Sequence, residues 1–169
     1  MGNALQSGAS EMSQPELIDQ SLLDHVSAAA EQAARRRQNY NFHETDEAAC
    51  HRLLNALEMD SYIRPHRHCA PSKDETMVAL RGRLGIVFFD DGGHVVSSTI
   101  LEPLGAHLGV NIPHGAWHTM VALSPGSVFF EAKAGPYVPL ADDEKAPWAP
   151  PEGSGEANEY LRGLRTLFS

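Results

Sequence analysis

The stretch TMVALRGRLGIVFFDDGGHVVSSTIL, residues 76–101, indicates the fold class. It contains three short apolar runs, at 76–80, 84–89 and 94–101, and the turn sequence Asp-Asp-Gly-Gly joins the last two. Short apolar runs separated by glycine-containing turns are typical of antiparallel strands. Strands this short, with turns this frequent, predict an all-β sandwich or barrel. Three more such runs follow, at residues 108–112, 117–123 and 127–133.

The predicted strands are apolar on both faces. Because side chains alternate along a strand, Met77 and Ala79 point to one side, and Val78 and Leu80 point to the other. A strand with two apolar faces is expected to be covered on both. N-terminal helices or a second subunit can cover the outer face, and on this basis we predict a homodimer.

Composition excludes several classes of protein. The chain has 169 residues, with 13 Lys and Arg and 22 Asp and Glu, so its net charge is 13 − 22 = −9. An acidic chain without a basic tract is a poor partner for nucleic acid or an anionic membrane surface. Two cysteines make no disulfide framework, and no apolar span reaches membrane-crossing length. The N-terminus lacks the features of a signal peptide, so we expect a cytoplasmic protein. Because nucleic acid and membranes are poor partners, we expect a small-molecule ligand.

Helices are expected before the strands. Residues 1–12 are small and polar, and we expect them to be flexible. Ser13-Gln14-Pro15-Glu16 resembles a capping box and predicts a helix that runs to about Arg37. Residues 39–43 would then form a connection. Apolar residues at 49, 53, 54 and 57, after a possible cap at Thr45 or Asp46, predict a second short helix.

These patterns divide the chain into four parts. After the flexible N-terminus, residues 13–58 are predicted to form helices that pack on a barrel. Residues 59–134 are predicted to form the barrel and to hold its site. Residues 135–169 are rich in proline and acid, and they predict an irregular arm with a short helix near 158–167.

The chemistry of the chain centres on two segments, Arg64-Pro65-His66-Arg67-His68 and Pro113-His114-Gly115-Ala116-Trp117-His118. His66 and His68 are two residues apart, so on an extended chain they point to the same side. Glu75 can join them from the next strand, and the turn before His118 can bring a third imidazole to the same point. Three neutral imidazoles and one carboxylate suit a divalent transition metal and leave a coordination position open.

Each of these residues also has a simpler interpretation. A His-x-His pair on a strand is more often solvated or hydrogen-bonded than bound to a metal. Glu75 can instead accept a hydrogen bond beside the ligands or act as a general base. Asp74 is the other candidate for the carboxylate.

The two segments resemble the paired motifs of the cupin superfamily, G-x5-H-x-H-x3,4-E-x6-G and G-x5-P-x-G-x2-H-x3-N. Glu75 and Gly82 match the end of the first motif, although six residues separate His68 from Glu75 and Asp60 replaces the leading glycine. The Pro-x-Gly-x2-His part of the second motif fits fully, and it ends at His118. Ala122 stands where that motif has asparagine, and His107 stands where it begins with glycine.

Longer strings are similar to the WbuC family of cupin-fold metalloproteins. They are NYNFH at 39–43, PHRH at 65–68, KDE at 73–75, LRGR at 80–83 and KAGPY at 133–137. This resemblance covers roughly residues 35–162. It implies a double-stranded β-helix, the cupin jelly roll, with an N-terminal helical extension. It also implies an internal metal (Fe, Zn, Ni or Mn) held by His66, His68, Glu75 and His118.

Further residues are candidates for substrate binding. Cations near a metal site in an acidic protein favour an anionic ligand, although they can equally neutralise neighbouring carboxylates. Glu131 and Lys133 share one face of the last predicted strand, and the alternative role for them is a structural ion pair. The complete set of candidates is Arg64, Lys73, His107, Glu131, Lys133 and Tyr137.

The sequence therefore predicts a metalloprotein that acts on a small polar molecule, for example an anionic sugar or a sugar nucleotide. The metal would act as a Lewis acid, as in an isomerase or epimerase, or would support oxygen chemistry if it is Fe(II). Genes of the WbuC family often lie among those for surface polysaccharides, which suggests that setting. The alternative is a binding module that holds a metabolite with the help of a metal and does not turn it over.

Overall fold

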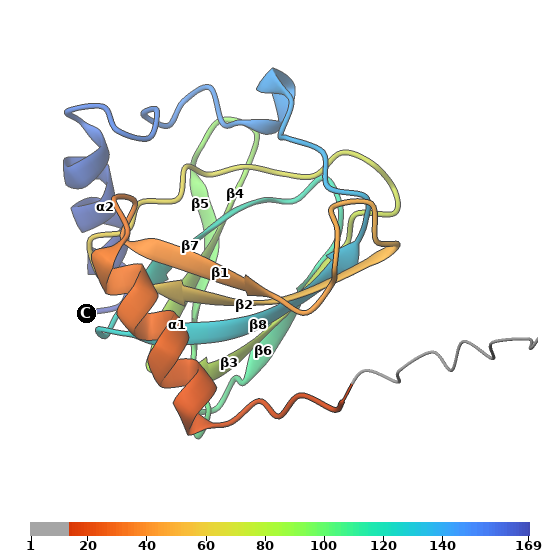
Figure 1. Cartoon of the computed structure of the whole chain (residues 1–169). Helices are drawn as coiled ribbons and strands as arrows, with labels where there is room; N and C mark the ends of the chain where they lie inside the picture. Colours follow the sequence, from red (N-terminus) through yellow and green to blue (C-terminus); the bar gives the residue numbers. More distant parts are fainter. Residues whose placement is uncertain (1–13) are drawn as a thin grey trace, which may run out of the picture.

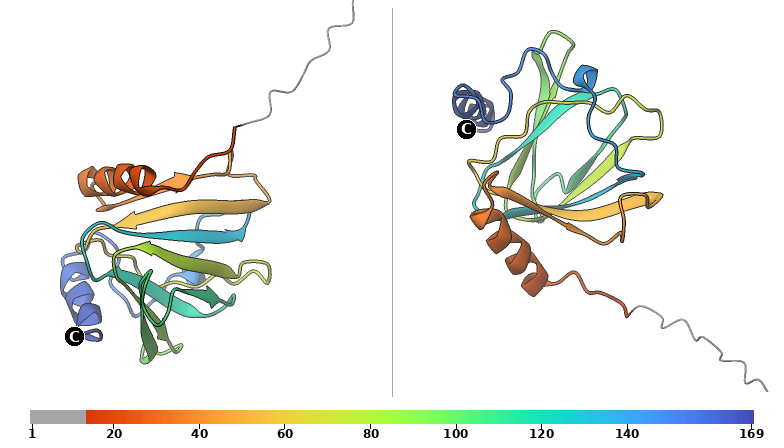
Figure 2. Two further views of the ribbon diagram at one scale, coloured as in Figure 1. Left: turned by 90° about the horizontal axis from the view of Figure 1, so that it is seen from below. Right: turned by 45° about the horizontal axis from the view of Figure 1, so that its top comes forward.

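The computed structural model describes residues 14–169, and its strands form two antiparallel sheets that face each other (Figures 1 and 2). The larger sheet contains, in spatial order, β1 (Arg37–Asn41), β2 (Cys50–Leu57), β8 (Ser127–Ala134), β3 (Glu75–Arg81) and β6 (Gly109–Ile112). The smaller sheet contains β5 (Val95–Leu101), β4 (Leu84–Phe89) and β7 (Trp117–Ala122). The helical segments are α1 (Gln20–Gln32), the 3-10 turn η1 (Asp142–Glu144) and α2 (Ala157–Thr166). This is the predicted all-β jelly roll.

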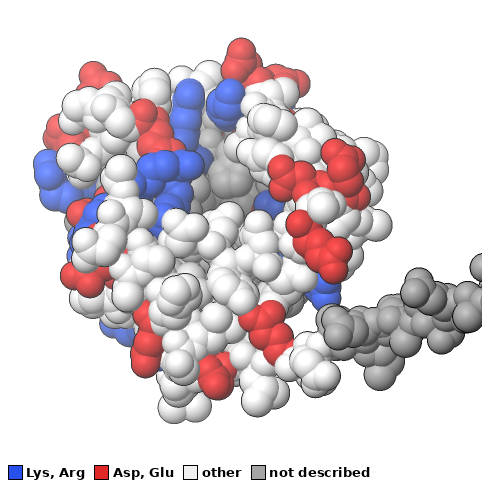
Figure 3. Space-filling model, in the orientation of Figure 1, with Lys and Arg blue, Asp and Glu red and all other residues white. Residues whose placement is uncertain are grey.

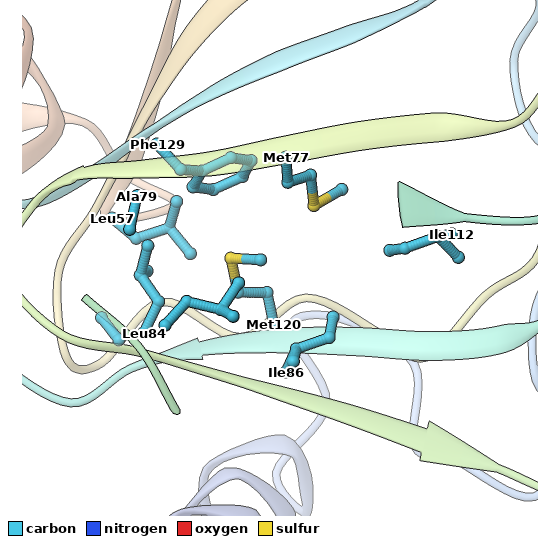
Figure 4. Close-up of a cluster of buried hydrophobic side chains, with 10 residues drawn as sticks. Leu57, Met77, Ala79, Leu84, Ile86, Ile112, Met120 and Phe129 are labelled. Carbon is cyan, nitrogen blue, oxygen red and sulfur yellow. The ribbon is translucent and has the colours of Figure 1, made fainter. Parts of the chain in front are cut away.

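The main core fills the space between the two sheets. Met77 of β3 and Phe129 of β8 face Ile86 of β4 and Met120 of β7 across this space (Figure 4). Met77 is therefore on the inner face, as the alternation along its strand predicts. The six strands predicted after residue 75 are present, and each boundary lies within a residue or two of its predicted position.

Each sheet is also covered on its outer face by residues of the same chain. Leu23 and Val26 of α1 pack on Leu54 of β2, outside the larger sheet (Figure 1). Leu161 and Leu164 of α2 belong to a second cluster, outside the smaller sheet. The two-sided apolar strands therefore have an intramolecular explanation, and the homodimer that was inferred from them stays a prediction.

The predicted second helix is wrong, and so is the predicted connection at residues 39–43. Cys50–Leu57 is the strand β2, and Arg37–Asn41 is the strand β1, which pairs with it antiparallel. Leu54 of β2 packs against α1, whereas Leu57 packs in the main core. A strand buried on both faces has apolar residues at both parities, and such a run is not distinguished from a helix by periodicity.

The first helix is shorter than predicted. Helix α1 begins at Gln20, where the Asp19 side chain accepts a hydrogen bond from the Leu22 N–H at 2.9 Å, so the cap is not at residue 13. The helix ends at Gln32 instead of near Arg37. The flexible segment predicted at residues 1–12, and Ser13, lie outside the described residues. None of the described helices has the length and hydropathy needed to cross a membrane.

Replacement of Leu54 by alanine tests the two-sided burial of β2. Leu54 is fully buried beneath α1, so Leu54→Ala should lower the free energy of unfolding by about 2–5 kcal/mol. The control is Leu104→Ala, because Leu104 is fully exposed and its loss should change stability by less than about 0.5 kcal/mol. Urea denaturation measures both, and equal effects of the two substitutions would contradict the assignment of β2.

Candidate metal centre

The backbone holds His66 beside His118. The segment before β3 is irregular, but His66 pairs with the edge of β7 through two hydrogen bonds. The His66 N–H donates to the His118 carbonyl at 3.0 Å, and the His118 N–H donates to the His66 carbonyl at 2.9 Å. On its other side, the chain at His66 forms a bridge with Lys145 of the C-terminal arm. The Ala146 N–H donates to the Pro65 carbonyl at 3.0 Å. The first histidine segment is thus fixed between β7 and the arm.

Local hydrogen bonds set the orientation of two imidazole rings. Nδ1 of His66 lies 3.0 Å from the Arg64 carbonyl oxygen, and Nδ1 of His118 lies 2.9 Å from the Ala116 carbonyl oxygen. Because a carbonyl oxygen only accepts, each Nδ1 carries the hydrogen, and each Nε2 is left with a free lone pair. A carbonyl behind the ring is the usual support of a metal-binding histidine.

Glu75, the first residue of β3, meets these rings in the interior. Its side chain is 2% exposed, and its two carboxylate oxygens lie 3.1 Å from Nε2 of His68 and 3.2 Å from Nε2 of His118. One ring nitrogen each of His66 and His68 and one oxygen of Glu75 also lie within 4.8 Å of one another. The structure therefore groups His66, His68 and Glu75, and His118 lies beside this group through its contact with Glu75.

This arrangement lacks a positive partner between its acceptors. Nε2 of His68, Nε2 of His118 and Oε2 of Glu75 are buried and have no hydrogen-bond partner among the described residues. A lone pair that faces a carboxylate is repelled unless a proton or a cation lies between them. Contacts of 3.1 and 3.2 Å between such acceptors are expected where the acceptors would share one cation. The donor set therefore fits a divalent transition metal.

The alternative carboxylate, Asp74, does not belong to this cluster. It is exposed, and its side chain accepts hydrogen bonds from the backbone N–H and the ring Nδ1 of His114, both at 2.8 Å. Because Asp74 and Glu75 are neighbours on an extended chain, their side chains point in opposite directions. Glu75 is therefore the residue that faces the imidazoles.

Lys133 supplies the one cation in contact with the Glu75 carboxylate in the described part of the chain. Its Nζ lies 2.9 Å from Oε1 of Glu75 and 2.6 Å from Oε1 of Glu131. Asn55 of β2 donates from Nδ2 to the other oxygen of Glu131 at 2.7 Å. The ion pair that the sequence analysis gave as the alternative role of Glu131 and Lys133 is thus present, and it lies directly beside the histidine cluster.

The environment shifts the pKa values of these groups in different directions. Burial and the neighbouring His118 lower the pKa of His66 to about 3, so this ring is neutral near pH 7. Burial alone would raise the pKa of Glu75, but hydrogen bonds from His118 and His68, when these rings carry a proton on Nε2, and the charge of Lys133 hold it below its usual range. Burial raises the pKa of Glu131, although Lys133 opposes the shift. A neutral imidazole beside an ionised carboxylate is the state in which both bind metal.

Two cavities lie on either side of the cluster, and His66 and Lys133 line both. The inner cavity has a volume of about 200 Å³ and contains Glu75 and His118 in its wall. The outer cavity has a volume of about 180 Å³ and is lined by Lys73 and by residues of the arm. The face drawn in Figure 3 is hollowed near its centre, and Lys and Arg side chains border the hollow.

The structure places several predicted substrate-binding residues elsewhere. Arg64 does not line either cavity, and its guanidinium donates two hydrogen bonds to the Ala146 carbonyl, at 3.1 and 2.6 Å. His107 lies in the exposed loop between β5 and β6 and lines neither cavity. Lys73 lines the outer cavity, but its Nζ donates to the carbonyls of residues 134 and 136. Tyr137 lines the same cavity and is 57% exposed.

The sequence analysis missed four polar residues in the wall of the inner cavity, namely Arg35, Arg37, Asn39 and Asn55. Three of them were assigned to a helix end and a connection, and the fourth to a helix that does not exist. No local pattern marked them, because residues 35–39, RRRQN, are polar at every position and so lack the alternation of a strand with one polar face.

The comparisons with known proteins give the following matches. Residues 18–101 match the model of a family described as a domain of unknown function, DUF6016. This region contains His66, His68 and Glu75, and it ends before His118. A search of curated proteins found no match. The more specific similarity to the WbuC family stays a prediction.

Solved structures align at low identity. KdgF from Halomonas sp. is 19% identical over 63% of this chain and 83% of its own, with a TM-score of 0.46. A conserved protein of unknown function from Streptococcus pyogenes is 11% identical over 80% of this chain and 100% of its own, with a TM-score of 0.49. A recombinant oxalate oxidase in complex with glycolate is 14% identical over 63% and 54%, with a TM-score of 0.48. We therefore base the fold on the strand order and register of this chain.

Removal of the Lys133 charge tests the electrostatics of the centre. In protein treated with a chelator, Lys133→Met leaves Glu75 and Glu131 buried without their cation and should destabilise the fold by about 3 kcal/mol. Adding Glu131→Gln to that variant removes one of the two charges and should restore part of the loss. Chemical denaturation of the three proteins measures this, and an unchanged stability in Lys133→Met would contradict the assigned ion pairs.

Proposed function

We propose that this chain is a cupin-type metalloprotein in which His66, His68, Glu75 and His118 hold a divalent transition metal. The observation that carries the proposal is the set of buried, unpartnered Nε2 atoms that face the Glu75 carboxylate at 3.1 and 3.2 Å. Imidazole nitrogen and carboxylate oxygen suit Fe, Zn, Ni and Mn alike, so the donor set defines a class of metal.

The chemistry that such a metal supplies when bound is Lewis-acid activation of a ligand oxygen. The residues of the chain prepare the site for it. The backbone carbonyls of Arg64 and Ala116 fix two rings with Nε2 directed inward. Lys133 orients Oε1 of Glu75, and Glu131 in turn holds Lys133. The C-terminal arm pairs with the segment at His66 and so encloses the centre on that side.

The cavities favour a small ligand. The inner cavity, at about 200 Å³, is smaller than the roughly 300–1,000 Å³ that is usual for drug-sized ligands. Three of the candidate ligands, His66, Glu75 and His118, line it together with Arg35 and Arg37. We infer a small polar, anionic substrate in preference to a sugar nucleotide, and we propose that the protein is an enzyme that acts on it. A metabolite-binding module without turnover is the alternative, and an assay for product separates the two.

Metal content tests the proposal. The purified wild-type protein should hold close to one metal ion per chain, and His66→Ala and His118→Ala should each remove it, because each deletes one ligand. The matched control is His107→Ala, since His107 lies in an exposed loop away from both cavities. Elemental analysis gives the ratio of metal to protein.

Thermal unfolding provides a second readout of the same variants. A metal that binds only the native state raises the melting temperature when it is added. Added zinc should therefore stabilise the wild type and His107→Ala, but not His118→Ala. Equal metal content in all four proteins, or equal stabilisation in all of them, would refute the proposed centre.

We also propose a homodimer that forms through the free edge of the smaller sheet. β5 is an edge strand, and Val96 in it is 67% exposed. Leu108, in the following loop, is also exposed. Exposed apolar residues at an open edge favour association. Light scattering should give twice the mass of the chain, and Val96→Lys should reduce it; a monomeric wild type would contradict this proposal.

A further inference from the structure

Two arginines hold a carboxylate of the same chain beside the inner cavity. Arg35 donates from Nε and Nη2 to the two carboxylate oxygens of Glu152, at 2.7 and 3.0 Å. Arg37 donates from Nη2 to one of these oxygens at 2.8 Å. Proteins often recognise a carboxylate ligand in this way, with one guanidinium group in bidentate contact and a second one beside it.

The arginines belong to the same cavity as the proposed metal ligands. Both line the inner cavity, whose wall also contains His66, Glu75 and His118. The side chain of Arg37 is only 15% exposed, and its Nη1 also donates to the Tyr62 carbonyl at 3.0 Å, so its position is fixed. A rigid, largely buried cation in the wall of a small cavity is suited to binding an anion there.

Glu152 does not belong to this cavity. It lies in the loop before α2, is 33% exposed, and lines a separate surface groove of about 480 Å³. Arg35 lines both the groove and the inner cavity, and it therefore forms the boundary between them. Because the Glu152 side chain is 33% exposed, its carboxylate can regain water when another carboxylate takes its place on the arginines, which lowers the cost of the exchange.

We propose that Arg35 and Arg37 form a carboxylate-binding site at the edge of the inner cavity, and that Glu152 is an internal competitor for it. The ligand is a small hydroxy acid, whose carboxylate replaces that of Glu152 on the arginines. This deepens the proposed function, on which it rests for the second contact, that of a ligand hydroxyl with the metal. Arg35 and Arg37 thus take the substrate-binding role that the sequence analysis predicted for Arg64 and Lys73.

The test compares carboxylates with neutral molecules of the same shape. The probes are glycerate and gluconate, each paired with its amide, and calorimetry measures their binding to the zinc-loaded protein. In Glu152→Gln, which removes the competitor, both carboxylates should bind about tenfold more tightly than in the wild type, and the amides should be unchanged. The matched control is Asp60→Asn, because Asp60 pairs with Arg36 in the same surface groove. It should leave all four affinities unchanged.

Loss of the arginines should have the opposite effect. Arg35 is 65% exposed, so Arg35→Gln should fold normally, and it should reduce the preference for carboxylate over amide in the Glu152→Gln background. Arg37→Lys keeps a positive charge but not the planar group, and it should reduce the preference too. Thermal unfolding shows that each variant is folded.

The outcomes separate this inference from the metal proposal. If no metal binds, the preference of Glu152→Gln for carboxylates should still appear in chelator-treated protein, because it depends on the arginines alone. If metal binds but Glu152→Gln and the wild type bind carboxylates and amides equally, the carboxylate site is refuted and the metal centre stands. A carboxylate preference that survives Arg35→Gln and Arg37→Lys would also refute it.

Discussion

The site depends on the pairing of His66 with His118 through two backbone hydrogen bonds. These residues are 52 positions apart in the sequence, and they lie in different parts of the fold, His118 in β7 and His66 in the irregular segment before β3. The pairing joins an irregular segment to the edge of β7, and Lys145 of the C-terminal arm forms a second bridge with His66 from the opposite side. Because the backbones are held on both sides, the two rings start from fixed positions, and their own carbonyl contacts then direct Nε2 to Glu75. Such pre-organisation reduces the conformational entropy that ligand binding would otherwise cost.

The interior of the barrel is divided between packing and charge. Met77 and Glu131 lie opposite each other in the register of β3 and β8, yet Met77 packs in the main core and Glu131 binds Lys133. Two buried carboxylates that share one partly buried cation are not an arrangement that stability favours, because the carboxylates must be removed from water. These charged groups beside the unpartnered imidazoles cost stability, but they make the wall of the inner cavity strongly polar. A cation at the imidazoles would balance the second carboxylate.

The position of β1 and β2 connects the fold to the chemistry. Arg37 and Asn39 share one face of β1, and Asn55 belongs to the neighbouring strand β2, so all three reach the inner cavity. On the other side of β2, Leu54 packs against α1. The same strand pair therefore forms the polar wall of a cavity and the base of a helix. Because the sequence analysis assigned this strand pair to a helix and a connection, it did not identify Arg37 as a residue of the cavity wall.

The sequence by itself determined the run of strands from residue 75 onward and the C-terminal helix, and it predicted the group of His66, His68 and Glu75, beside which His118 lies. These features depend on local alternation, on turn residues and on short motifs, all of which are visible within a few positions. Only the tertiary structure decided that residues 50–57 are a strand, because a strand covered on both faces loses its alternation. It also decided that Arg64 binds the arm while Arg35 and Arg37 face the cavity. Which cation meets which acceptor depends on contacts between residues distant in sequence, and no local pattern records them.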